Sequence, residues 1–103
     1  MNKRATALEE LLARLADGQI VPVETEDWEA WRQALPVVKT VPSAIGGDKH
    51  AVRWPVPGSR RRGWALVEEA EPGLMAVRPL RDRKQVLALI AERLAAYERM
   101  WDG

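Results

Sequence analysis

The fold is decided by residues 51–77, which read AVRWPVPGSRRRGWALVEEAEPGLMAV. In the first part of this stretch, Val52, Trp54 and Val56 fall at every second position, so they would share one face of a β-strand. Residues 57–63 are rich in glycine, proline and arginine, which is typical of the loop in a β-hairpin. The stretch therefore predicts two antiparallel strands that are joined by an arginine-rich loop.

The sequence around this hairpin extends it into a meander. The chain returns from the loop as an expected strand over 64–69, and a further strand is expected over 74–77. Between them, Pro72 and Gly73 occupy the two positions at which a type II turn favours these residues. Upstream, residues 37–41 read VVKTV, a β-branched run that favours another strand. The sequence predicts an antiparallel meander of three to four strands.

Two helices are expected before the meander. Residues 6–16 carry leucines at helical spacing, and Thr6 is the residue type that caps such a helix. Residues 25–35 begin with Thr25 as a second capping residue and carry two tryptophans on the predicted apolar face. Between these helices, residues 20–23 are β-branched but contain a proline, so they form at most an edge strand or an extended linker.

A third and longer helix is expected over 82–101. Asp82 can cap it, with Gln85 three residues later, and apolar residues continue at helical spacing almost to the end of the chain. We expect this helix to pack on the sheet. The sequence thus predicts an α+β fold in one domain over 1–103, with two N-terminal helices, the meander and the long C-terminal helix.

The composition restricts the classes of function. The chain has 103 residues, of which 47 % are apolar and 30 % charged, as is usual for a small globular protein. It has no cysteine, which excludes a disulfide framework and a thiol nucleophile. The sequence shows neither a signal peptide nor an apolar run long enough to span a membrane, so we expect a cytoplasmic protein that does not bind membranes. Few amides and many charges suit a thermophile, although a GC-rich genome would favour the same composition.

The charges are balanced overall but not locally. Sixteen basic and fifteen acidic side chains give a formal net charge of +1, so a nucleic-acid-binding function would need a local patch. Residues 49–64 contain no acid and carry Arg60, Arg61 and Arg62 in the predicted loop. Arginine binds phosphate oxygens bidentately, and a tryptophan on each side of the loop could stack on unpaired bases. Two other interpretations remain open, a solvated turn whose tryptophans pair across the strands, and a contact with an acidic protein.

A second basic cluster stands at the start of the last predicted helix. Cations there oppose the helix dipole, which is unfavourable unless an anion is bound nearby. The sequence does not place this cluster relative to the loop. If both share one surface, the predicted nucleic-acid-binding residues are Arg53, Arg60, Arg61, Arg62, Arg81, Arg83 and Lys84.

Two further hypotheses come from other classes of function. The last helix has more apolar length than a small sheet covers, so Met100 and Trp101 are candidates for a homodimer contact in a protein–protein adaptor. A small RNase-like enzyme would use His50, the only histidine, as its general base. We identify no catalytic residues, no metal ligands and no cofactor motif, and the binding module is the leading hypothesis.

Overall fold

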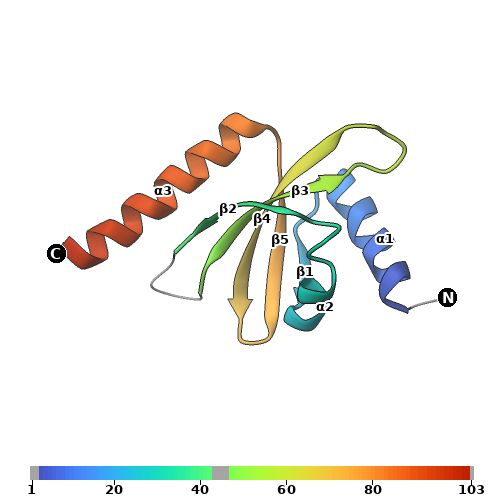
Figure 1. Ribbon diagram of the computed structural model, residues 1–103, viewed down its shortest axis with the longest axis horizontal. Coiled ribbons are helices and arrows are strands. Elements are labelled where there is room, and N and C mark those ends of the chain that lie inside the picture. The colour runs from blue at the N-terminus through green and yellow to red at the C-terminus, as the bar shows by residue number, and fades with distance from the viewer. Residues whose placement is uncertain (1–2, 43–46, 103) are drawn as a thin grey trace.

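The computed structural model describes residues 3–42 and 47–102, and the side chains of residues 7–42 and 47–100 (Figure 1). Its elements, in chain order, are α1 (Lys3–Ala16), β1 (Val21–Glu24), α2 (Thr25–Ala30), β2 (Val37–Val41), β3 (Lys49–Pro55), β4 (Arg62–Glu71), β5 (Leu74–Leu80) and α3 (Arg83–Asp102). The mixture of three helices and an antiparallel sheet in the described residues confirms the predicted α+β class.

The sheet has five strands in the order β1-β5-β4-β3-β2, and every neighbouring pair is antiparallel. Strands β2 to β5 form the predicted meander. The expected count of three to four strands is wrong because β1 adds to the far side of β5. Val21 and Val23 are buried there while Pro22 is exposed, and β1 is an edge strand, which is where a residue without an N–H is tolerated.

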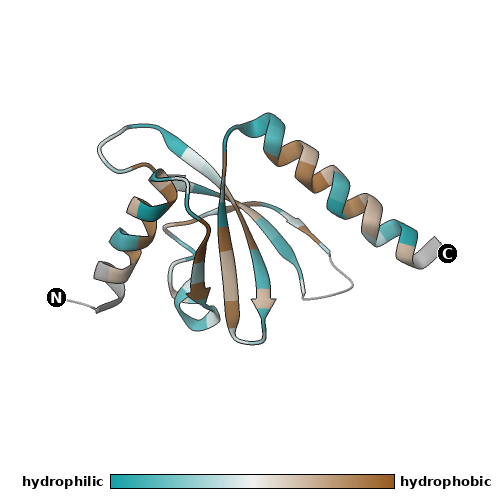
Figure 2. Cartoon of the chain, turned by 180° about the vertical axis from the view of Figure 1, so that it is seen from behind, coloured by the Kyte–Doolittle hydropathy of each residue, from teal (hydrophilic) through white to brown (hydrophobic). Residues whose placement is uncertain are grey.

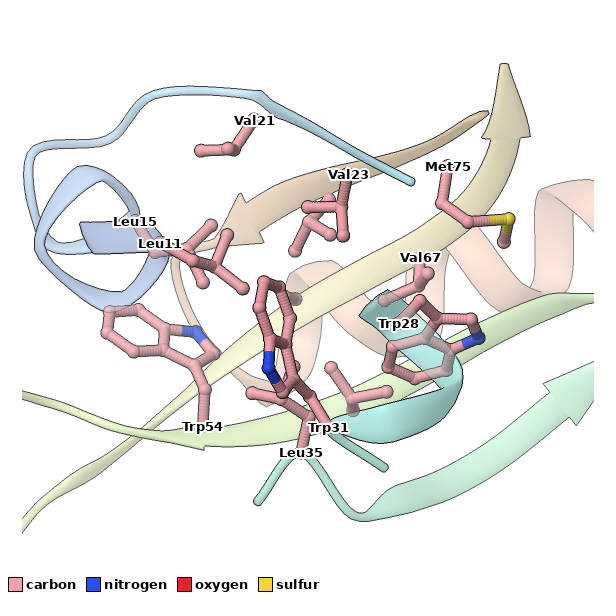
Figure 3. Packing of buried hydrophobic residues seen from close by; sticks show 13 residues of the cluster. Leu11, Leu15, Val21, Val23, Trp28, Trp31, Leu35, Trp54, Val67 and Met75 are labelled. Carbon is pink, nitrogen blue, oxygen red and sulfur yellow. The ribbon is translucent and has the colours of Figure 1, made fainter. Parts of the chain in front are cut away.

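Both faces of the sheet are covered. The larger cluster lies on the side of α1 and α2, and it includes Trp28, Trp31 and Trp54, which fill much of the volume in a chain without phenylalanine (Figure 3). The smaller cluster lies on the side of α3 and consists of Ala51, Leu66, Leu80 and Val86. The sheet is therefore the middle layer between two unequal cores.

The long helix α3 packs on the sheet as predicted, but only with its first turns. Asp82 accepts a hydrogen bond from the Gln85 backbone N–H at 2.9 Å, and the Gln85 side chain accepts one from the Arg81 N–H at 2.6 Å. This confirms the predicted cap. Val86 is buried, whereas the C-terminal half of α3 extends beyond the sheet on the side of β2 (Figures 1 and 2). The described residues contain no helix that is both long and apolar enough to cross a bilayer.

Two of the predicted capping residues are wrong. Helix α1 already begins at Lys3, so Thr6 lies inside it. Thr25 is the first residue of α2 rather than its cap, since the preceding Glu24 has extended backbone angles and occupies the cap position without a side-chain hydrogen bond. The Thr25 N–H donates to Gly73 O at 3.0 Å in the turn between β4 and β5. Helix α2 also ends at Ala30, earlier than expected. The loop expected between β2 and β3 lies partly outside the described residues.

A close approach between Trp54 and Gly63 fixes the hairpin. The two residues are paired across β3 and β4, and the Trp54 indole lies so close that a Cβ at position 63 would meet its ring atoms at under 3.0 Å. The indole N–H also donates to Trp64 O at 3.0 Å. Position 63 therefore requires glycine because of space, not because of a special backbone conformation.

We expect Gly63→Ala to lower the free energy of unfolding by about 1–3 kcal/mol, since the new methyl group overpacks this contact. Urea unfolding followed by far-UV circular dichroism measures the change. In a Trp54→Leu background the same substitution should cost clearly less, because the smaller side chain leaves room. An equal cost in both backgrounds would show that the indole is not the cause.

Candidate functional site

The two basic clusters, separate in sequence, lie at the same end of the sheet. Pro55 at the end of β3 is paired with Arg62 at the start of β4, and Trp64 is paired with Leu80 at the end of β5. The β3–β4 loop and the start of α3 therefore leave the sheet at the same end, and from there the loop and the helix run in opposite directions (Figure 1). We call this region the basic end and define it by Arg53, Arg60, Arg61, Arg62, Arg81, Arg83 and Lys84.

The loop at the basic end is held by its own hydrogen bonds. The Val56 N–H donates to Arg61 O at 3.2 Å, and the Ser59 N–H donates to Val56 O at 3.1 Å. The Arg61 N–H donates to the Ser59 hydroxyl at 3.0 Å. These bonds order the backbone, while the side chains of Arg60 and Arg61 remain exposed. The loop thus presents its cations from a defined backbone.

The guanidinium of Arg53 makes its contacts within the hairpin. Its guanidinium carbon lies 4.0 Å from the centre of the Trp64 ring, a cation–π contact. Its Nε donates to Gly63 O at 3.2 Å and its Nη2 donates to Arg62 O at 2.8 Å. The sequence predicted Arg53 as a phosphate contact, but two of its donor groups already bind backbone carbonyls. Its charge adds to the basic end, and its contacts hold the backbone of the neighbouring arginine.

The two tryptophans beside the loop do not face one another. Trp54 points to the side of α1 and is buried, whereas Trp64 lies on the side of α3 and is half-buried. The interpretation in which both stack on bases is therefore not supported by their placement. Trp64 is the one near the surface, and Arg53 covers part of its ring.

Two hollows lie beside the start of α3. Arg81 lines a cleft of about 500 Å³ together with Trp54 and Val56. Arg83 and Trp64 line a groove of about 310 Å³ between α3 and β2. The second basic cluster therefore lies on both sides of the hairpin base, a neighbourhood that the sequence did not reveal.

The acidic residues do not neutralise the basic end. Among the described side chains, no carboxylate lies within 4.0 Å of the five cations Arg60, Arg61, Arg62, Arg83 and Lys84, and only Asp82 approaches Arg81, at 4.0 Å. Exposed Glu24, Glu69 and Glu71 lie at the other end of the strands, where β1 and β4 finish. A nearly neutral chain thus has a charge gradient along its strands.

His50 is not part of the basic end. It lies under α2, where its ring centre is 5.9 Å from that of Trp28 and its Nδ1 is 3.0 Å from the Thr40 hydroxyl. Burial lowers the pKa of His50 below the ordinary 6.5, and the nearby Arg32 charge lowers it further. This histidine and the arginines of the loop therefore do not form one site.

No group of three or more histidine, aspartate or glutamate side chains that could hold a metal ion occurs in the part of the chain that the structure describes. No family model matches the chain, and neither the curated proteins nor the solved structures include a match. The interpretation of the basic end therefore rests on its geometry and charge.

We expect acidification to destabilise the protein partly through His50. The folded state binds this proton less tightly than the unfolded chain, whose histidine titrates near 6.5, so the free energy of unfolding should fall as the pH drops through about 6.5. Urea unfolding at about pH 7.5 and about pH 5.5 measures the loss. A His50→Gln variant should lose less between these conditions, and an identical loss in both proteins would contradict the assignment.

Proposed function

We propose that the protein is a non-catalytic module that binds the phosphate backbone of nucleic acid through its basic end. The observation that carries this proposal is the position of two basic clusters at one end of the sheet, where among the described side chains a carboxylate lies within 4.0 Å of only one of the seven cations, Arg81. Cations that lack internal partners keep their charge and donors available for an external anion. Phosphate backbones are the polyanions that arginine clusters bind most effectively.

The parts of the basic end have different roles in this proposal. Arg60, Arg61 and Arg62 supply the main phosphate contacts, because they project from an ordered loop. The cations at the start of α3 extend the surface along the phosphate backbone. Arg53 acts as a positioning residue, since it holds the carbonyls of Arg62 and Gly63. Contacts of this kind bind backbone rather than bases, so we expect little sequence preference.

A second candidate function is a homodimeric protein–protein adaptor. It is favoured by the apolar side chains that α3 leaves exposed, Leu87, Leu94 and Met100. The third sequence hypothesis, an RNase-like enzyme, is not proposed, because His50 lies under α2 and away from the loop arginines.

The first proposal is tested by fluorescence anisotropy of labelled random DNA and RNA at several salt concentrations. We expect binding that weakens steeply with salt, log K falling by about 0.9 per neutralised phosphate on duplex DNA and about 0.7 on single strands. The variant Arg60→Ser, Arg61→Ser, Arg62→Ser should lose most of the affinity and have a shallower salt slope.

The matched control is Arg14→Ser, Arg32→Ser, Arg99→Ser, which removes three exposed arginines that lie in α1, in the turn after α2 and near the end of α3. Both variants change the formal net charge from +1 to −2, that is, +1 minus 3. If the loop matters, only the loop variant loses binding. Equal losses would mean that general charge and not the basic end causes the attraction, and no binding at low salt would refute the proposal.

A further inference from the structure

The exposed apolar residues of this protein are concentrated on one side. Of the five large apolar side chains that are exposed in the described residues, four lie on the side of β2 and α3: Val38, Leu87, Leu94 and Met100. Val38 and Leu87 are 56 % and 54 % exposed and line the groove between β2 and α3. The groove is lined by the first turns of α3, and the rest of this helix extends beyond the sheet (Figures 1 and 2).

One side of α3 carries four residues whose spacing is symmetric about the middle of the helix, so that two antiparallel copies could match each other. Arg83, Leu87, Leu94 and Glu98 follow one another at intervals of four, seven and four residues, which at 3.6 residues per turn places them on one side of the helix. The midpoint of Arg83 and Glu98 lies between residues 90 and 91, and so does the midpoint of the two leucines. We call these four residues the α3 stripe.

This symmetry fits a second copy of the same helix as the partner. Two antiparallel copies of α3 that cross between Ile90 and Ala91 would place Leu94 of each copy against Leu87 of the other. The same alignment places Glu98 of each copy against Arg83 of the other, so in such a dimer Arg83 would be paired and the other six cations of the basic end would remain for phosphate. Neither charged side chain has an ion-pair partner within the described residues. A C2 interface must be complementary to itself, and the α3 stripe meets that condition in both its apolar and its charged positions.

We propose that two copies of this chain associate through antiparallel pairing of their α3 stripes. The proposal rests on the homodimer considered as the second candidate function, and it adds the register. Leu94 of one copy enters the groove lined by Val38, Leu87 and Ile90 of the other. The small side chain of Ala91, which is exposed, lets the helices approach at the crossing.

Other features of α3 agree with this register. The helix is anchored on its own sheet by Val86 and by the ion pair of Arg93 with Glu68, so the α3 stripe points sideways and not into the sheet. Arg99 is five residues from Leu94, which is roughly 140° around the helix and outside the contact. Met100 is six residues from Leu94, roughly 120° around the helix, so it also lies outside the contact. The Trp101 side chain is outside the described residues. An interface confined to these elements is small, so we expect association that depends on concentration.

The test measures mass in solution without nucleic acid, by light scattering or sedimentation over a wide range of protein concentrations. The wild-type mass should rise from 11.6 kDa towards twice that value. Leu94→Glu should remain monomeric, because it places a carboxylate in the apolar part of the contact. The matched control is Ile20→Glu, which alters the fifth exposed apolar residue, at 57 % exposure and away from the α3 stripe. It should still associate.

Charge reversal tests the register itself. Arg83→Glu and Glu98→Arg should each weaken association, since each places like charges together in both halves of the contact. The double variant should restore it, because the reversed pair again matches across the two copies. Far-UV circular dichroism and urea unfolding confirm that each variant is folded.

A wild-type chain that stays monomeric at every concentration would refute both the homodimer and the register. A wild-type dimer that Leu94→Glu leaves intact, or whose charge reversals do not rescue one another, would refute the register but not the homodimer. The dimer proposal is tested by mass in solution and the phosphate-binding proposal by anisotropy. A failure of one proposal can therefore be distinguished from a failure of the other.

Discussion

The arrangement of this protein depends on the contact between the indole of Trp54 and the backbone at Gly63. No other residue type leaves the indole this space, so the contact fixes how β3 and β4 lie against each other. Because neighbouring residues of a strand point to opposite faces, fixing Trp54 on the side of α1 sends Arg53 and Trp64 to the side of α3. The core and the start of the basic loop are thus determined by the same contact.

The two faces of the sheet are not equally protected. On the side of α1 and α2, three tryptophans and a large set of aliphatic residues exclude water (Figure 3). On the side of α3, the helix is held by a few apolar contacts and by Glu68, whose carboxylate lies 3.2 Å from Lys49 Nζ and 3.7 Å from Arg93 Nη2. These three side chains are partly shielded from solvent, so their attraction is stronger than that of a surface pair. The thinner packing leaves the groove beside β2 accessible.

Several local features were predictable from the sequence because they depend on neighbouring residues, whereas the caps expected at Thr6 and Thr25 were wrong. The hairpin and the cap by Asp82 and Gln85 both follow from patterns within a few positions. Strand β1 was underestimated, since it is short, contains Pro22 and is stabilised by pairing with β5, which is distant in sequence.

The basic residues of the candidate site were predictable from the sequence, but their arrangement in space was not. The sequence indicated both basic clusters, but their neighbourhood follows from the strand order and could not be read from residue spacing. The role of Arg53 was missed because its partners are the Trp64 ring and backbone carbonyls, which leave no signal in the sequence. The different faces of the two tryptophans were implicit in the strand period, but only if the register between β3 and β4 was known.

The separation of charge along the strands has a consequence for the molecule as a whole. The chain has a formal net charge of only +1, yet arginines lie at one end of the strands and glutamates at the other, so these charges add to the dipole moment of the molecule in the same direction. Near a charged surface, electrostatic forces therefore orient the molecule before any contact has formed. A collision that begins with the end of like charge is repelled or leads to reorientation.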